Sequence, residues 1–314
     1  CPCNFLTDTP PKRGQATATG PGTWSISHDE AGQRFWHEQQ GLHVVDSIET
    51  LLDPTGKTQN LMLTYAVRDG IISHCGEVRS TVIRPREEAM DLNDIERPSQ
   101  YAPYTWEGCV VKIADKIAYL GRDIEDAVRL GILKEDGKPL QDLLKELNSY
   151  SREPIQSVTN TSIMYPLITD ICRESSPEAG LVLSQSHINM MDAVMRFNYA
   201  HIYKNKRLEV YHAYARLILE SVYKLLRECY DGTETMNNIR LLAKDYPTLG
   251  RHFEKRMKKF SDSGRLEADP DEYGNKVIYR ISDSEADYKK ACIDYIAGMT
   301  DTYAEKIFGE MTTF

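Results

Sequence analysis

Acidic, basic and hydroxyl side chains gather along one face of the segment 111–127, which reads VKIADKIAYLGRDIEDA. At about 100° per residue, a helix brings together on that face Asp115, Tyr119, Arg122, Asp123 and Asp126. Three cations of the same segment, Lys112, Lys116 and Arg122, could form a local basic pocket for a polyphosphate. The same spacing is also typical of a solvated helix face with ion pairs three or four residues apart.

The opposite face of this segment predicts how the polar residues are positioned. It carries only apolar side chains at helical spacing: Ile113, Ile117, Leu120, Ile124 and Val128. We therefore predict one long helix over about 105–133, stopped by the sequence EDGKP at 135–139. Its apolar face would pack on a core, and its polar face would meet water or a ligand.

Most of the remaining chain also shows helical periodicity, which predicts an all-α fold with minor strand content. The predicted helices cover about 35–52, 63–74, 140–150, 154–174, 186–201, 208–230, 233–245, 248–262 and 284–311. Residues 75–103 are predicted to be a polar loop, and a short hairpin is predicted at 273–276. The Pro-, Gly- and Thr-rich stretch 1–34 is predicted to be an irregular leader.

Composition restricts the class of protein. The chain has 314 residues, of which 41% are hydrophobic and 27% charged, as in soluble globular proteins. It contains no apolar run of membrane-spanning length and no secretory signal pattern, which favours a cytoplasmic location. The net charge of -9 gives no strong nucleic-acid signal. Seven scattered cysteines indicate reduced thiols rather than a disulfide framework.

Several motifs together resemble a known family. The order Asp-Lys-x-x-Tyr-x-x-Arg-Asp at 115–123 is similar to the last motif of deoxynucleoside triphosphate triphosphohydrolases, the dGTPase-like branch of the HD-domain phosphohydrolases. Further matches follow in the family's order at 35–45 (FWHEQQGLHVV), 63–65 (LTY), 68–71 (RDGI), 106–108 (WEG), 197–199 (FNY), 202–203 (IY) and 294–301 (DYIAGMTD). The resemblance runs from about Phe35 to the C-terminus and implies an HD-domain-like multi-helix bundle.

The resemblance also implies chemistry at particular residues. In such enzymes water attacks the α-phosphorus of a dNTP and releases a deoxynucleoside and inorganic triphosphate. Asp115 matches the last ligand of a divalent metal, Mg²⁺ or Mn²⁺, and His37 matches the general acid for the leaving 5′ oxygen. Glu38 could orient the His37 imidazole. Contacts to phosphate or sugar are implied for Lys116, Tyr119 and Asp123.

The sequence departs from the family pattern upstream of His37. No histidine precedes His28, and the His28-Asp29 dipeptide lies in a Gly- and Pro-rich stretch rather than on an apolar helix. Three of the four expected metal ligands are therefore not found, and we expect an N-terminally truncated core: a leader at 1–34, an HD-type remnant at 35–150 and a helical region at 151–314. An apolar helix face left without its partner would favour self-association.

Two functions from different classes fit these observations. The first is a dNTP triphosphohydrolase-like enzyme that needs a divalent metal and acts as a homo-oligomer without membrane contact. The second is a non-catalytic helical module for nucleotide binding or oligomerisation that derives from the same family. A third outcome, a truncated product without a stable fold, is also open. Metal-dependent release of triphosphate separates the first from the others, and nucleotide-induced stabilisation separates the second from the third.

Overall fold

The computed structural model describes residues 36–75 and 82–313. The predicted leader 1–34, with His28-Asp29, and Phe35 of the first motif lie outside the described residues. The described chain folds into two compact units: 36–42 with 64–208 form unit 1, and 43–63 with 209–313 form unit 2. The expected boundary near residue 150 falls inside unit 1, and the division into an HD-type remnant and a C-terminal region stays a prediction.

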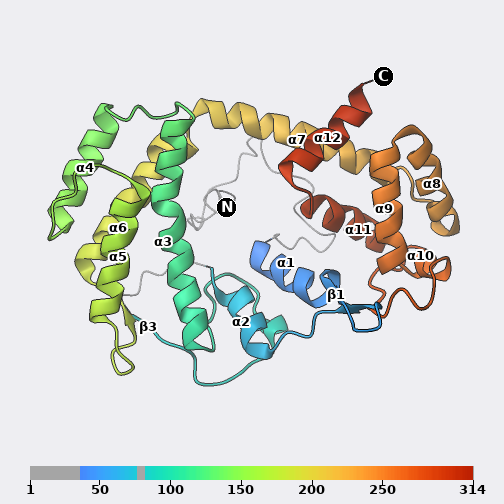
Figure 1. The fold of residues 1–314 in the computed structure, drawn as a ribbon, viewed down its shortest axis with the longest axis horizontal. Helices are drawn as coiled ribbons and strands as arrows, with labels where there is room; N and C mark the ends of the chain where they lie inside the picture. Colours follow the sequence, from blue (N-terminus) through green and yellow to red (C-terminus); the bar gives the residue numbers. More distant parts are fainter. Residues whose placement is uncertain (1–35, 76–81, 314) are drawn as a thin grey trace, which may run out of the picture. The chain divides into compact units, whose positions relative to one another are not determined.

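The all-α prediction is confirmed (Figure 1). The helices and strands are α1 (His37–His43), η2 (Val44–Ile48), β1 (Thr50–Leu52), β2 (Thr58–Asn60), α2 (Tyr65–Ser73), β3 (Val82–Ile83), η3 (Leu92–Asp94), α3 (Trp106–Arg129), α4 (Lys138–Tyr150), α5 (Asn160–Glu174), β4 (Leu181–Val182), α6 (Gln185–Asn198), η4 (Tyr199–Tyr203), α7 (Lys206–Arg227), η5 (Gly232–Glu234), α8 (Thr235–Asp245), α9 (Pro247–Phe260), α10 (Asp262–Leu266), α11 (Glu285–Ala297) and α12 (Asp301–Thr312). In the described residues the strands form two small antiparallel pairs, β1 with β2 and β3 with β4.

The long helix α3 is the centre of unit 1 and confirms the prediction for 105–133 closely. The Thr105 hydroxyl accepts a hydrogen bond from Gly108 N at 3.1 Å and so caps its start. Four residues of its predicted apolar face are buried, namely Ile113, Ile117, Leu120 and Ile124, and Val128 is half-buried. The helix ends before Gly131, whose φ of 68° lies in the left-handed region. The α3 core packs against α5 and α6, which run beside it in Figure 1.

Helix α5 lies very close to α3 at Gly121. A Cβ placed on Gly121 would lie 2.6 Å from the Asn160 Cα and 3.3 Å from the Asn160 N. That nitrogen donates to the Glu125 Oε1 of α3 at 2.8 Å. The glycine is therefore required by the backbone approach of the two helices, and not by its own conformation.

We expect Gly121→Ala to lower the free energy of unfolding by about 1–3 kcal/mol, although alanine is the better helix former, because the added methyl would push Asn160 away. Gly309→Ala in α12 is the matched control, since its Cβ would meet nothing within 4 Å. The control should gain about 0.5–1 kcal/mol. Denaturant unfolding followed by circular dichroism measures both. A Gly121→Ala protein as stable as its parent would contradict the close approach.

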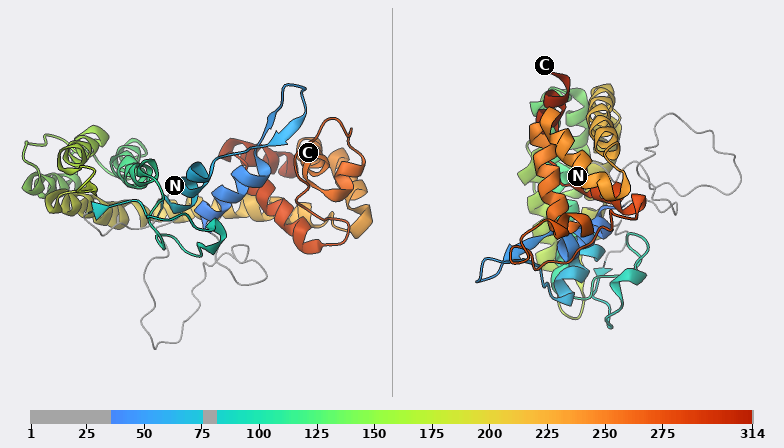
Figure 2. Two further views of the ribbon diagram at one scale, coloured as in Figure 1. Left: turned by 90° about the horizontal axis from the view of Figure 1, so that it is seen from below. Right: turned by 90° about the vertical axis from the view of Figure 1, so that its right-hand side faces the viewer.

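Unit 2 has its own core around α9. Helices α8 and α9 pack closely, and the buried Phe253 ring lies 6.1 Å from the Tyr288 ring and 5.1 Å from the Tyr295 ring. The fully buried Tyr279 hydroxyl donates to Asp294 Oδ2 at 2.7 Å, and His43 Nε2 lies 3.0 Å from the same oxygen. The β1–β2 hairpin stands out from the helices of this unit (Figure 2).

The prediction of one helix over 35–52 was wrong for its last four residues, 49–52. Helix α1 continues as the π-helix η2 only to Ile48, and the chain then forms the β1–β2 hairpin. Asp53 Oδ1 accepts from the backbone nitrogens of Thr55 and Lys57, and Gly56 adopts a φ of 87°. The turn residues therefore fold the neighbouring segments back on each other, instead of merely interrupting a helix.

Two smaller predictions differ from the structure. No hairpin forms at 273–276; Tyr273 instead makes an isolated parallel bridge to Thr58. The helix predicted over 154–174 begins at Asn160, because Thr159 and Ser162 form a capping box. The last helices, predicted over 284–311, are α11 and α12, and the Thr300 hydroxyl caps the second of them by accepting from Tyr303 N. In the part of the chain that the structure describes, no helix is long and apolar enough to cross a membrane.

Candidate functional site

The candidate site in unit 1 begins with His37 and Glu38 at the start of α1. Glu38 is 1% exposed, and its Oε2 lies 3.2 Å from His37 Nδ1. The two groups lie within ion-pair distance, although neither Glu38 oxygen accepts a hydrogen bond from the described residues. That Glu38 orients the His37 imidazole stays a prediction.

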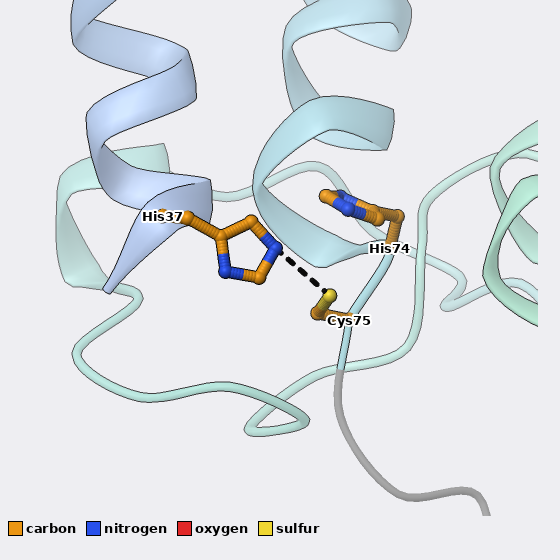
Figure 3. A group of neighbouring side chains, drawn as sticks. All are labelled: His37, His74 and Cys75. Carbon is orange, nitrogen blue, oxygen red and sulfur yellow. Dashed lines mark hydrogen bonds between the residues drawn. The ribbon is translucent and has the colours of Figure 1, made fainter. Parts of the chain in front are cut away.

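The last turn of α2 brings two further side chains to His37. His74 is the C-cap of α2, and Cys75 follows it. Cys75 Sγ lies 3.2 Å from His37 Nε2, and the His37 and His74 rings meet edge to face with centroids 5.6 Å apart (Figure 3). One ligand atom from each of His37, His74 and Cys75 can be chosen so that all three lie within 4.8 Å of one another.

Helix α3 adds Asp115 to this group. Its Oδ2 lies 3.9 Å from Cys75 Sγ, so Cys75 links the predicted metal ligand Asp115 to the predicted acid His37. One turn earlier on α3, the buried Lys112 Nζ donates to Ser73 O at 3.0 Å and to Cys75 O at 2.6 Å. Burial lowers the pKa of Lys112 below its ordinary value, and the charge interaction with Cys75 acts against this by raising that pKa. Lys112 therefore fixes the end of α2 against α3.

The predicted substrate contacts Lys116, Tyr119 and Asp123 lie further along α3 in different surroundings. Lys116 is only 8% exposed, and Tyr119 is half-buried against the core. Asp123 accepts a hydrogen bond from the Tyr203 hydroxyl at the end of η4, and burial raises the pKa of Asp123. About eight residues of helix, roughly 12 Å, separate Asp123 from Asp115. The structure thus does not gather all predicted residues into one cluster.

The basic pocket predicted from Lys112, Lys116 and Arg122 is wrong in composition. Lys112 and Lys116 are buried, and only Arg122 of these three is exposed. Its Nε lies 3.6 Å from Asp126 Oδ2 on the same helix face. The periodicity placed the lysines near the boundary of the two faces, where long side chains can reach inward to backbone carbonyls.

A buried ionic network supports the loop before α3. Arg86 Nη2 lies 2.5 Å from Asp69 Oδ1, and Asp69 Oδ2 accepts from Tyr104 N at 2.7 Å. Arg86 also donates to the Tyr65 hydroxyl at 2.6 Å and to Ala102 O at 2.8 Å. Asp69 is fully buried, so this network joins the loop to α2 through buried ionic and hydrogen bonds.

Sequence reasoning missed His74, Cys75 and Tyr203 as site residues. The signal for the first two was weak: two adjacent metal-ligand types at a helix end, with Cys75 38 residues from His37. Tyr203 packs against the core, and its hydroxyl also donates to Asp123.

The cysteines described by the structure are free thiols, as predicted. Burial raises the pKa of Cys109 and of Cys229 to about 11, and it raises that of Cys292 further. Cys172 on α5 is exposed, and Cys75 is half-buried. Cys1 and Cys3 lie outside the described residues.

The group around Asp115 does not suit Mg²⁺ or Mn²⁺. Those ions prefer an oxygen-rich shell, whereas the described neighbours of Asp115 offer two imidazoles and a thiol. Dependence on Mg²⁺ or Mn²⁺ therefore stays a prediction, and it needs oxygen ligands besides those of the described cluster.

Comparison with known proteins identifies distant relatives, and those described below share one description. No family model matches the chain. A "deoxyguanosinetriphosphate triphosphohydrolase-like protein" of Clostridium perfringens (strain 13 / Type A) is 26% identical over 277 residues, which are 88% of this chain and 60% of that protein. Proteins with the same description are 25% identical over 270 residues in Caldanaerobacter subterraneus subsp. tengcongensis and 27% identical over 274 residues in Azoarcus sp. (strain BH72). These alignments cover 86% and 87% of this chain and 56% and 64% of the relatives. The chain therefore spans about 60% of the length of the curated relatives that it matches.

Proposed function

We propose, from the similarity of this chain to dGTPase-like triphosphohydrolases, that it belongs to a protein that hydrolyses a dNTP to a deoxynucleoside and inorganic triphosphate. The observation that carries the proposal is the meeting of His37 and Asp115 through Cys75, since both were assigned catalytic roles by resemblance and come from distant helices. We propose a cytoplasmic location and a divalent metal for this activity.

The proposed work of the chain's own residues follows from their positions. His37 donates a proton to the leaving 5′ oxygen, and the buried Glu38 carboxylate lies beside its Nδ1. Asp115, exposed on α3, would hold a divalent metal together with oxygen ligands from outside the described cluster, and the metal would supply the charge that polarises the phosphoryl group. Tyr119 and Asp123 contact the sugar or the phosphates, with Tyr203 orienting the Asp123 carboxylate. Lys116 contacts a phosphate in this proposal.

A homo-oligomer belongs to the same proposal. Helix α7 exposes an apolar stripe at helical spacing, with Val210 72%, Tyr214 43% and Leu217 55% exposed. Contiguous exposed apolar side chains often mark a contact surface between proteins. They also support the alternative function, a non-catalytic nucleotide-binding or oligomerisation module.

The deciding experiment is release of inorganic triphosphate from each of the four dNTPs with Mg²⁺ or Mn²⁺. We expect metal-dependent release that falls by on the order of 10²–10⁴ in His37→Ala and is lost in Asp115→Ala. The exposed His212 and Asp142 provide the controls His212→Ala and Asp142→Ala, which should keep the parent rate.

Absence of release with every dNTP and both ions would reject the enzyme proposal for this chain. The alternative would then be tested by thermal unfolding, because a nucleotide that binds only the folded protein raises Tm in a saturable way. A Tm that is unchanged by all dNTPs would leave oligomerisation as the remaining role, measured by sedimentation.

A further inference from the structure

The group formed by His37, His74 and Cys75 is a metal-ligand set of its own, different from the hard oxygen site considered above. Its donor atoms come from the start of α1 and the end of α2, and Figure 3 shows His37 and Cys75 joined by a hydrogen bond, with the His74 ring beside them. We propose that this group, with Asp115 as the fourth ligand, binds Zn²⁺.

Cys75 Sγ is the atom at which the other donors of the group meet. His37 Nε2 and Asp115 Oδ2 both face it, at 3.2 and 3.9 Å. A cation beside this atom interacts favourably with the imidazole lone pair, the sulfur and the carboxylate together.

Both histidines are already oriented as metal ligands usually are. His74 Nδ1 lies 2.7 Å from Ile71 O, and since a carbonyl only accepts, Nδ1 carries the proton and Nε2 holds the lone pair. Glu38 Oε2 lies 3.2 Å from His37 Nδ1, the ring nitrogen that does not face Cys75. A carboxylate or backbone carbonyl on the far nitrogen fixes the tautomer of a zinc-ligating histidine in this way.

The spacing and chemistry of the donors select Zn²⁺ among divalent ions. Bonds of about 2.0–2.3 Å in a tetrahedral shell separate ligand atoms by roughly 3.3–3.8 Å. The two distances from Cys75 Sγ, 3.2 Å to His37 Nε2 and 3.9 Å to Asp115 Oδ2, lie on either side of that range. The ligand atoms of His37, His74 and Cys75 all lie within 4.8 Å of one another. Two imidazoles, one thiolate and one carboxylate are a borderline-soft set that suits zinc better than Mg²⁺ or Mn²⁺.

Zinc binding deprotonates Cys75, and the thiol proton passes to solvent as the Zn–S bond forms. The buried Lys112 ammonium, which donates to Cys75 O, favours the resulting thiolate. Where the proposed function holds, His37 as a zinc ligand has no lone pair left to take up the proton that it would give to the leaving oxygen. Zinc occupancy and hydrolysis then exclude each other.

The test uses the full chain with Cys1→Ser and Cys3→Ser, so that the N-terminal thiols cannot contribute. The chelator-stripped protein is titrated with Zn²⁺ against a chromophoric zinc indicator, and then with Co²⁺ as a spectroscopic probe. We expect one tight Zn²⁺ site, release of one proton, and a thiolate-to-cobalt charge-transfer band. No nucleotide is present, so the result does not depend on whether the chain hydrolyses dNTPs.

Cys75→Ser and His74→Gln should each weaken zinc binding by at least about 100-fold, and Cys75→Ser should abolish the charge-transfer band. Cys172→Ser and His212→Gln, which change exposed residues of the same types, should alter neither. The proposal is overturned if the cobalt complex of the unsubstituted Cys75 protein lacks the sulfur band. Unchanged zinc affinity in both ligand variants would overturn it as well, and circular dichroism verifies that each variant is folded.

Discussion

Replacing Arg86 with methionine is expected to lower the free energy of unfolding by about 3–5 kcal/mol. The guanidinium is 12% exposed, and its partner Asp69 is fully buried, so methionine fills much of the space but leaves a buried carboxylate without its counter-ion. The Tyr65 hydroxyl and Ala102 O lose a donor at the same time. Guanidinium chloride unfolding followed by circular dichroism measures the loss.

The control for this prediction is Arg97→Met in the same loop. Arg97 is exposed, so the substitution should change the free energy of unfolding by no more than about 0.5 kcal/mol. The double variant Arg86→Met, Asp69→Asn should recover part of the stability, because the uncompensated charge is removed. If Arg86→Met were as stable as Arg97→Met, the buried network would contribute nothing and the argument for it would fail.

Replacing Lys112 with methionine is the second large effect, with an expected loss of roughly 2–4 kcal/mol. Its ammonium is the donor that joins α3 to the carbonyls of Ser73 and Cys75, and a thioether cannot replace it. A neutral amine keeps two N–H donors, so the bonds to the two carbonyls do not depend on the charge of Lys112. The unfolding free energy of the parent and variant should therefore differ at both pH 7 and pH 10.

Lys145→Met on α4 controls for the loss of a lysine, since that side chain is 81% exposed. The control should stay within about 0.5 kcal/mol of the parent. A Lys112→Met protein with parental stability would show that water satisfies the two carbonyls equally well. Zinc affinity gives an independent measurement, because loss of the bond to Cys75 O should loosen the proposed ligand and weaken binding.

The long helices could be predicted from sequence because their stabilisation is local and periodic. Ile113, Ile117, Leu120 and Ile124 repeat at helical spacing, and all four are buried where expected. The β1–β2 hairpin could not be predicted in the same way. Leu51 and Leu52 continue an apparently helical apolar pattern, yet they are 68% and 71% exposed, and the turn bonds of Asp53 decide the fold.

The candidate site was only partly predictable for a related reason. Resemblance identified His37 and Asp115, but their meeting depends on Cys75, which lies at the end of another helix. The direction of a lysine side chain also cannot be predicted from periodicity: Lys112 and Lys116 were predicted to line a basic pocket, and both are buried. Burial of a long cationic side chain depends on which carbonyls lie within its reach, and that is a tertiary property.

Each of the two units contains at least one buried free cysteine, so thiol labelling can detect local unfolding of either unit. Alkylating agents react with thiolates, so the buried thiols of Cys109 in unit 1 and of Cys229 and Cys292 in unit 2, with pKa values raised by burial, are shielded in the native state. Exposed Cys172 reacts without any opening. The rate at which each buried cysteine becomes labelled therefore measures how often its own unit opens, and mass spectrometry of the labelled peptides can time the two units separately in a single sample.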